Sequence, residues 1–173
     1  MTDETPTGII CDANVLIHYF FADKRILQLV ARHIGPVCVP RPIIDDEVDQ
    51  MDIESATQLG LTIIEADDAL ILECSTQGGP LSKHDKLLVA LARNNHYICW
   101  TSDSCLKRQC EAEGIQTCWG LEMMLRLCKH GHLSPSTALD IARTIGELDK
   151  RFITPEIIVE FEHKLRNDRG ERG

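Results

Sequence analysis

The chain of 173 residues has no hydrophobic run that approaches the roughly 18 consecutive apolar residues of a membrane span. Its first residues are acidic and lack the basic start and apolar stretch of a secretory signal. No C-x-x-C pair occurs among its eight cysteines. We therefore expect a cytoplasmic protein without a membrane segment, in which the cysteines act as small hydrophobes rather than as disulfides.

Basic residues are missing from one long segment. From Pro42 to Ser82 there are ten acids and no lysine or arginine, whereas the rest of the chain carries 17 acids and 18 bases. Because one segment accounts for the net charge of −9, that charge does not exclude RNA binding elsewhere on the chain. Candidate phosphate-contacting residues outside the segment are Arg41, Lys83, Lys86, Arg93, Lys107, Arg108, Arg126 and Lys129.

Strand-like and helix-like segments alternate over the first 130 residues. We expect strands at 8–12, 37–39, 61–64, 97–100 and 116–118, with intervening helices that include 43–57, 82–94, 104–113 and 119–130. The alternation predicts an α/β fold, three layers (α/β/α) around a mostly parallel central sheet. After Gly131 the strands cease, and Ser134-Pro135 and Thr154-Pro155 each begin a helix. We expect a domain over 1–131, a two-helix C-terminal extension over 132–168 packed on it, and a tail over 169–173.

Carboxylates stand at the ends of expected strands or near the starts of expected helices. Asp12 and Asp103 each follow a strand, and Glu47 and Asp85 lie in the helices between strands. Acids at the strand ends of an α/β sheet converge where such sheets bind ligands. Converging carboxylates repel one another unless a hard cation lies between them. The sequence therefore predicts a site for a divalent metal.

These segments resemble a known family, the PIN domain, which is a metal-dependent ribonuclease fold. The run Cys11-Asp12-Ala13-Asn14-Val15-Leu16-Ile17 is similar to its opening motif D-x-N/S-V-L-I, and Val39-Pro40 through Glu47-Val48 resembles the segment that carries its second acid. Residues 81–92 resemble the helix of the third acid, and Thr101-Ser102-Asp103 resembles the T-x-D after the fourth strand. The likeness covers residues 8–125, and the closing helices resemble those of helix-extended VapC-like toxins.

The resemblance implies an endoribonuclease that uses Mg²⁺ or Mn²⁺ to hydrolyse single-stranded RNA, leaving 5′-phosphate and 3′-hydroxyl ends. It implies the catalytic acids Asp12, Glu47, Asp85 and Asp103, of which Asp12, Asp85 and Asp103 would bind metal, with Asn14, Ser102 and Ser104 in support. Glu47 would bind a second metal or orient the water. The expected partners are RNA, an antitoxin protein and a second copy of the chain. Ser104 stands where many members carry a further acid.

Other interpretations of the same residues stay open. Asp12 and Asp103 could simply cap the helices that follow them, and Asp45 or Asp46 could replace Glu47. We expect His84 to be a surface histidine, with contact to phosphate as the alternative. We expect Trp100 and Trp119 to be core or interface residues, with base stacking as the alternative. The nearest approaches to zinc spacing are Cys105-x4-Cys110 and the string Cys128-Lys129-His130-Gly131-His132.

Three functional alternatives differ from the nuclease. A receiver domain fits poorly because Asp12 has no adjacent acid and Lys107 lies on an expected helix. A haloacid-dehalogenase-type phosphatase needs D-x-D, and here Asp12 is followed by Ala13-Asn14. A non-catalytic PIN-like module that binds RNA or protein remains possible in place of the nuclease, because Ser104 stands where many members carry a further acid.

Overall fold

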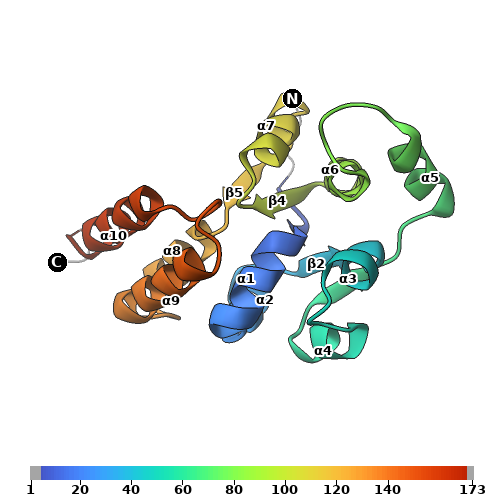
Figure 1. Ribbon diagram of the computed structural model, residues 1–173. Helices are drawn as coiled ribbons and strands as arrows, with labels where there is room; N and C mark the ends of the chain where they lie inside the picture. Colours follow the sequence, from blue (N-terminus) through green and yellow to red (C-terminus); the bar gives the residue numbers. More distant parts are fainter. Residues whose placement is uncertain (1–4, 171–173) are drawn as a thin grey trace.

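Five parallel strands form the centre of the molecule (Figure 1). The computed structural model describes residues 5–170, with side chains up to residue 168. The strands are β1 (Gly8–Cys11), β2 (Val37–Pro40), β3 (Thr62–Ile64), β4 (Tyr97–Thr101) and β5 (Thr117–Trp119). They lie in the order β3-β2-β1-β4-β5, and each neighbouring pair is parallel. The predicted α/β fold is confirmed, and the described sheet is parallel throughout rather than mostly so.

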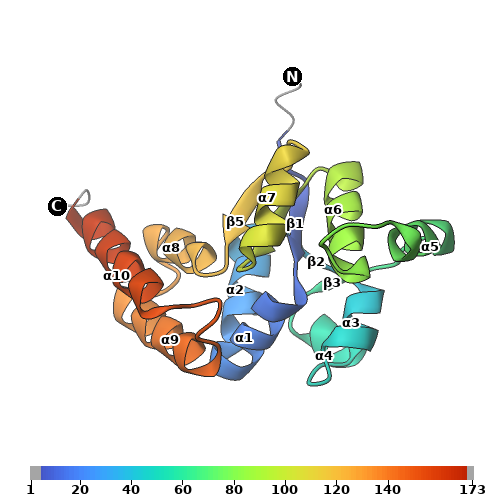
Figure 2. The ribbon, with the colours of Figure 1, turned by 45° about the horizontal axis from the view of Figure 1, so that its top comes forward.

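Helices cover both faces of the sheet. Those in the described residues are α1 (Ala13–Asp23), α2 (Arg25–His33), α3 (Arg41–Glu47), α4 (Ile53–Gln58), α5 (Asp68–Thr76), α6 (Lys83–Asn95), α7 (Ser104–Ala112), α8 (Glu122–Lys129), α9 (Pro135–Leu148) and α10 (Pro155–Gly170). The helices α6 and α7 pack on one face, and α1 and α2 pack on the other with α8 beside α2 (Figures 1 and 2). This arrangement gives the three predicted layers.

The central strands are buried on both faces, as expected of a parallel sheet covered by helices. Every residue of β1 and β2 is buried, which explains their continuous apolar sequences. Trp100 of β4 is fully buried, and its indole N–H donates to the carbonyl of Gly120 at 3.0 Å. The same carbonyl accepts a hydrogen bond from the hydroxyl of Tyr19 at 2.6 Å. Trp100 is thus a core residue, as one of the two interpretations predicted.

The segment expected to be one helix over 43–57 is two helices. The first, α3, ends at Glu47, and Val48 adopts a non-helical conformation (φ −116°, ψ 78°). Val48 and Met51 are both buried, so the chain turns inward between the helices. Asp52 then caps α4 by accepting from the Ser55 N–H at 2.8 Å. A buried turn and a second cap therefore divide the predicted helix.

The chain after residue 131 forms two helices that pack on the rest of the molecule. The side chain of Ser134 caps α9, which packs against α1 and α8, and α10 packs against α9 and α8. Phe161 and Leu165 are buried in this contact. The helix α10 continues to Gly170, so the polar sequence predicted as a tail from 169 is helical for two further residues; residues 171–173 lie outside the described part. Over residues 5–170 no helix is long and apolar enough to cross a membrane.

The strand order defines one position where the direction of winding reverses. From β1 the chain adds β2 and β3 on one side, and then crosses to add β4 and β5 on the other. In open α/β sheets the crevice at the carboxyl ends of the two strands at such a reversal is the usual ligand site. Here these strands are β1 and β4, and Asp12 and Asp103 lie just beyond their ends.

Candidate functional site

Asp12 is fixed at the end of β1 by hydrogen bonds to both of its carboxylate oxygens. Its Oδ1 accepts from the Val15 N–H at 2.8 Å, which makes Asp12 the N-cap of α1. Its Oδ2 accepts from the hydroxyl of Thr101, the last residue of β4. The residue is buried, so a carboxylate is held at the carboxyl end of β1 with little freedom to move.

Asp103 lies on the neighbouring strand connection and shares a partner with Asp12. Its backbone N–H donates to Thr101 Oγ1 at 3.0 Å, and Thr101 in turn donates to Asp12. Its Oδ1 accepts from the N–H groups of Cys105 and Leu106 at 2.7 and 3.2 Å, so Asp103 caps α7. Thr101, which is fully buried, therefore couples the two caps.

Asp85 reaches the same crevice from α6. This helix packs against β1 and β4 and leads into β4, so its first turn lies at the carboxyl edge of the parallel sheet. Ser82 caps the helix by accepting from the Asp85 N–H at 3.1 Å. The cap fixes the first turn, in which Asp85 is the acidic residue.

Asp85 and Asp103 are close enough to Asp12 for their charges to affect its ionisation. The pKa of Asp12 is raised to about 7, mainly by burial, and the charges of Asp85 and Asp103 act in the same direction. The hydrogen bonds from Thr101 and Val15 oppose this increase. Burial likewise raises the pKa of Asp85, and the charge of Asp103 adds to it. The ionised forms of two predicted metal ligands, Asp12 and Asp85, are therefore disfavoured at these positions. A cation bound between the carboxylates would stabilise the ionised forms.

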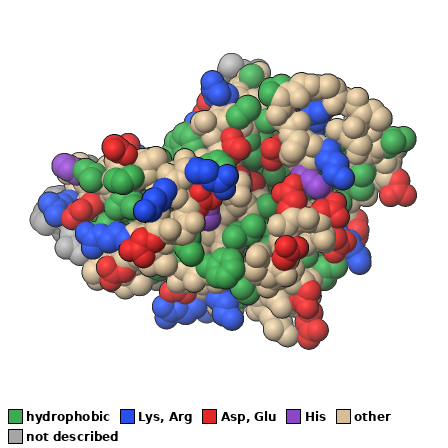
Figure 3. Space-filling view, viewed as in Figure 1, with side chains coloured by type: hydrophobic (Ala, Val, Ile, Leu, Met, Phe, Trp, Pro, Cys, Tyr) green, Lys and Arg blue, Asp and Glu red, His purple; other side chains and the backbone are tan. Residues whose placement is uncertain are grey.

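Glu47 lies beside this group but is engaged by another residue. The imidazole Nδ1 of His84 is 2.6 Å from Glu47 Oε1, and its Nε2 is 2.8 Å from Asp46 Oδ2. Burial raises the pKa of Glu47, His84 lowers it, and the charges of Asp85 and Asp46 raise it. Glu47 thus borders the aspartates through Asp85. Acidic side chains gather on this part of the surface, between α3 and α6, in Figure 3.

His84 differs from the surface histidine that we expected. Its side chain is only 12% exposed, and it joins α6 to α3 through two acidic partners. Asp46, the possible replacement for Glu47, is half exposed and is paired with this histidine. The only sign in the sequence that His84 belongs near the acids was its position immediately before Asp85. Its partners, which lie 37 and 38 positions earlier in the chain, gave no local signal.

The three predicted supporting residues have different surroundings. Asn14 is partly exposed in the first turn of α1, and Ser104 is exposed at the start of α7. Ser102 is buried, and within the described residues its Oγ has no hydrogen-bond partner. It packs against Gly120, where an added Cβ would lie 2.0 Å from this oxygen. The residue that supports Asp12 and Asp103 directly is Thr101, which the sequence analysis included in a motif but did not assign to the site.

The site offers oxygen ligands, as Mg²⁺ and Mn²⁺ prefer. Over the described residues, no group of three or more His, Cys, Asp or Glu side chains already has an arrangement that could hold a metal ion. Mg²⁺ usually keeps several waters and needs only one or two direct carboxylates, so this finding does not conflict with a hydrated ion. Asp12, Asp85 and Asp103 fit such an ion because they supply carboxylate oxygens, and because neighbouring negative charge raises the pKa of Asp12 and of Asp85.

The cysteines do not form the alternative zinc site. Seven of the eight are buried and Cys105 is partly exposed, in agreement with their expected role as small hydrophobes. In the string 128–132, the ring of His132 stacks on that of His33 with centroids 3.7 Å apart. This stacking and the burial of Cys128 give the string a packing role in the described structure.

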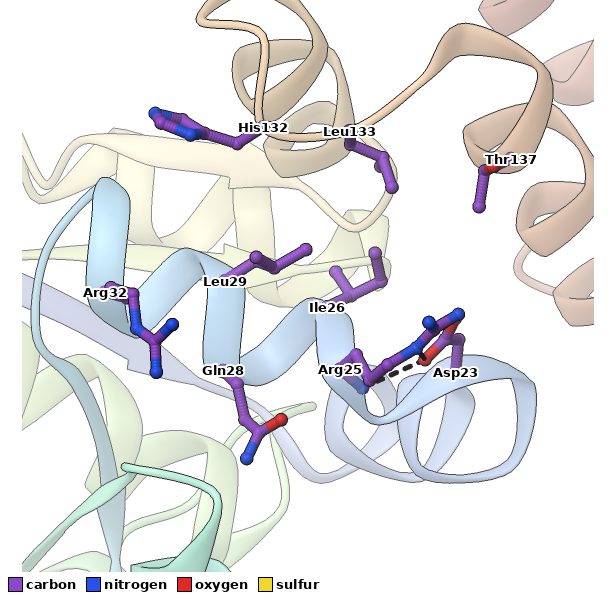
Figure 4. A pocket seen from close by; sticks show the side chains of 9 residues that line it. All are labelled: Asp23, Arg25, Ile26, Gln28, Leu29, Arg32, His132, Leu133 and Thr137. Atoms are coloured by element: carbon purple, nitrogen blue, oxygen red, sulfur yellow. Dashed lines mark hydrogen bonds and ion pairs between the residues drawn. The ribbon is translucent and has the colours of Figure 1, made fainter.

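A separate pocket lies away from the acids, between α2 and the segment that leads into α9 (Figure 4). It has a volume of about 390 Å³ and an open rim, where Arg25 forms an ion pair with Asp23 at 2.6 Å. Figure 4 shows Arg32 and Gln28 pointing away from His132 rather than converging with it. None of the predicted site residues lines this pocket, so it is not part of the candidate site.

Comparisons with known proteins identified no match: no family model, no curated protein and no solved structure matched the chain. The geometry described above, together with the sequence motifs, therefore carries the functional argument.

Proposed function

We propose that this chain is a divalent-metal-dependent endoribonuclease of the PIN type, which cleaves single-stranded RNA as the toxin of a toxin–antitoxin pair. One observation carries the proposal: Asp12, Asp85 and Asp103 lie near the reversal point of a parallel sheet, where the charges of Asp85 and Asp103 raise the pKa of Asp12 and the charge of Asp103 raises that of Asp85. The motifs around the same three acids resemble those of PIN domains. Position, chemistry and sequence pattern thus support the same reaction.

In this reaction each acid has a distinct part. Bound Mg²⁺ or Mn²⁺ would supply positive charge for the phosphodiester and lower the pKa of a coordinated water. Asp12 and Asp103 present carboxylates whose orientation is fixed by helix caps and by Thr101. Asp85 completes the set from α6. Glu47, which His84 holds in place, orients the attacking water.

The test is cleavage of an end-labelled single-stranded RNA in Mg²⁺, in Mn²⁺ and in EDTA. The proposal expects cleavage in either metal, none in EDTA, and none by the double variant Asp12→Asn with Asp103→Asn. Asp52→Asn is the matched control, because Asp52 is also a helix N-cap but lies at an exposed position on α4. Circular dichroism checks that each variant is folded. Cleavage that persists in EDTA or in the double variant would refute the assigned centre.

The toxin assignment has its own test. Induced expression of the wild-type chain should arrest bacterial growth, whereas expression of the double variant at the same level should not. If cells that express either chain grow equally and RNA cleavage is confirmed in vitro, the nuclease proposal stands and the toxin proposal is refuted.

A specific observation favours a second candidate, a non-catalytic PIN-like module that binds RNA or protein. The described side chains include no ready group of three metal ligands, and Ser104 stands where a further acid is common. Titration with Mn²⁺ by calorimetry separates the two candidates. Binding that is lost in Asp12→Asn supports the enzyme, and no binding by folded wild-type protein supports the module.

A further inference from the structure

A cleft of about 450 Å³ adjoins the acidic site on the side of β5. One wall comes from the connections that follow β4 and β5, and the other comes from α10 and the loop before it. Asp103 belongs both to this cleft and to the acidic site, so the two are continuous. Its volume lies in the range of ordinary small-ligand pockets, roughly 300–1,000 Å³.

Trp119 stands at the mouth of this cleft. In the sheet, Trp119 of β5 pairs with Thr101 of β4, whose hydroxyl donates to Asp12. Trp119 therefore lies on the strand next to the one that ends at the acids. Although Trp119 is large and apolar, 42% of it is exposed. Lys107, which does not line the cleft, has its Nζ 5.0 Å from the centroid of the indole ring. Trp119 therefore has a cation against its ring and is at the same time part of the cleft lining.

The opposite wall repeats the combination of an aromatic ring and a cation. Phe152 and Ile157 provide apolar surface, and the guanidinium of Arg151 lies 5.5 Å from the centroid of the Phe152 ring. The side chain of Arg151 is 82% exposed, and that of Lys164 is also exposed. Arg151 pairs with Asp149, whose side chain is 16% exposed, and Lys164 pairs with the exposed Glu160. An ion pair as exposed as that of Lys164 and Glu160 contributes little stability. Figure 3 shows hydrophobic, basic and acidic side chains interspersed over α10 on this face.

The distribution of charge distinguishes the two sides of the acidic site. The side formed by β2, β3 and α3–α5 consists largely of segment 42–82, which contains no lysine or arginine. On the side formed by β5, α7 and α10, the cleft lining contains the bases Arg151 and Lys164 together with the acids Asp103, Glu122 and Glu160. Lys107 lies against Trp119 on the same side. A polyanion that reaches Asp103 therefore meets basic side chains on this side and none in segment 42–82.

We propose that this cleft binds an unpaired nucleobase of the RNA substrate, which stacks on Trp119 next to the scissile phosphate. The proposal rests on the proposed nuclease function and adds a subsite to it. Stacking on an indole needs no particular base, because every base has a π face, so the subsite selects single-stranded RNA rather than a sequence. A base inside a duplex is already paired and stacked and cannot enter the cleft.

The test combines a change in the protein with a change in the ligand. Binding of fluorescein-labelled 12-nucleotide single-stranded RNA is measured by anisotropy in EDTA for wild type, Trp119→Ala and Trp119→Phe. A second RNA of the same length is built from abasic ribose-phosphate units. Phe21→Ala is the matched control, since Phe21 is 53% exposed and does not line the cleft. Cleavage of the normal RNA in Mn²⁺ is followed for the same variants.

The expected result is a loss of roughly five- to one-hundred-fold in affinity for normal RNA in Trp119→Ala, with most affinity retained in Trp119→Phe. The abasic RNA should bind wild type and Trp119→Ala equally. An equal loss on both RNAs, or none on either, in a wild type that cleaves RNA would overturn the subsite and leave the nuclease intact. Wild-type protein that neither binds nor cleaves RNA would overturn the nuclease and the subsite together, as expected if the cleft holds a peptide.

Discussion

Replacing Asp12 with asparagine should make the metal-free protein more stable at neutral and alkaline pH. Burial raises the pKa of Asp12 from 3.8 to about 7, so its ionised form is disfavoured in the folded state. A shift of about three units, at about 1.36 kcal/mol per unit, corresponds to roughly 4 kcal/mol. Because asparagine keeps an oxygen for the Val15 N–H but changes the bond with Thr101, we expect a net gain of roughly 2 to 4 kcal/mol in unfolding free energy above pH 7.

The sign of the pH dependence follows from where the proton is held. Below pH 3.8 Asp12 is protonated in both states, and its contribution to wild-type stability is fully present. Between pH 3.8 and about 7 the folded state keeps the proton that the unfolded state loses, so stability falls as pH rises. Above about pH 7 both states are ionised and the loss is complete. The advantage of Asp12→Asn should therefore grow from pH 4 to 7 and then remain constant.

Urea unfolding in EDTA at several pH values between 4.5 and 8.5 measures this difference directly. Asp52→Asn serves as control, because the Ser55 N–H lowers the pKa of that exposed cap and its removal should give no gain above pH 4. Addition of Mn²⁺ should stabilise wild type and leave Asp12→Asn nearly unchanged. An Asp12→Asn protein that is less stable than wild type at pH 8, or a difference that is independent of pH, would refute the reasoning.

Thr101→Val removes the hydroxyl whose hydrogen bond lowers the pKa of Asp12. In urea titrations of this variant, the pH range over which the unfolding free energy falls should therefore extend to higher pH. Gly120→Ala should lower the unfolding free energy by roughly 1–3 kcal/mol through overpacking. Adding Ser102→Ala to this variant should restore most of the lost stability, because the contact at 2.0 Å is with the Ser102 hydroxyl. Thermal melts of the single and double variants measure both changes. His84→Gln should move the acidic limb of the cleavage profile to higher pH, because His84 lowers the pKa of Glu47.

The order of helices and strands was predictable because each signal was local. Alternating apolar runs gave the five strands, and Ser134 with its following proline marked the start of α9. The division of segment 43–57 was missed because the apolar Val48 and Met51 also fit a helical stripe. Only their burial beneath a turn, which is a tertiary fact, shows that they do not form one.

The site was partly predictable for a related reason. Asp12, Asp85 and Asp103 were selected by position relative to strands and helices, and the topology brings exactly those positions to one edge of the sheet. The engagement of Glu47 by His84 depends on how α3 approaches α6, for which sequence spacing carries no information. The unpartnered hydroxyl of Ser102 likewise depends on the close approach of Gly120 from another strand connection.

The structural and catalytic interpretations of the acids are not alternatives. Asp12 and Asp103 do cap α1 and α7, as the structural interpretation predicted. Each cap fixes one carboxylate oxygen to backbone N–H groups, and a carboxylate fixed in this way would be preorganised for the metal that the proposed function requires. Asparagine is about as good a cap as aspartate, so substitution to asparagine removes the charge and keeps the cap. Loss of metal binding in such a variant, with the helices retained, would therefore report on the charge and not on the fold.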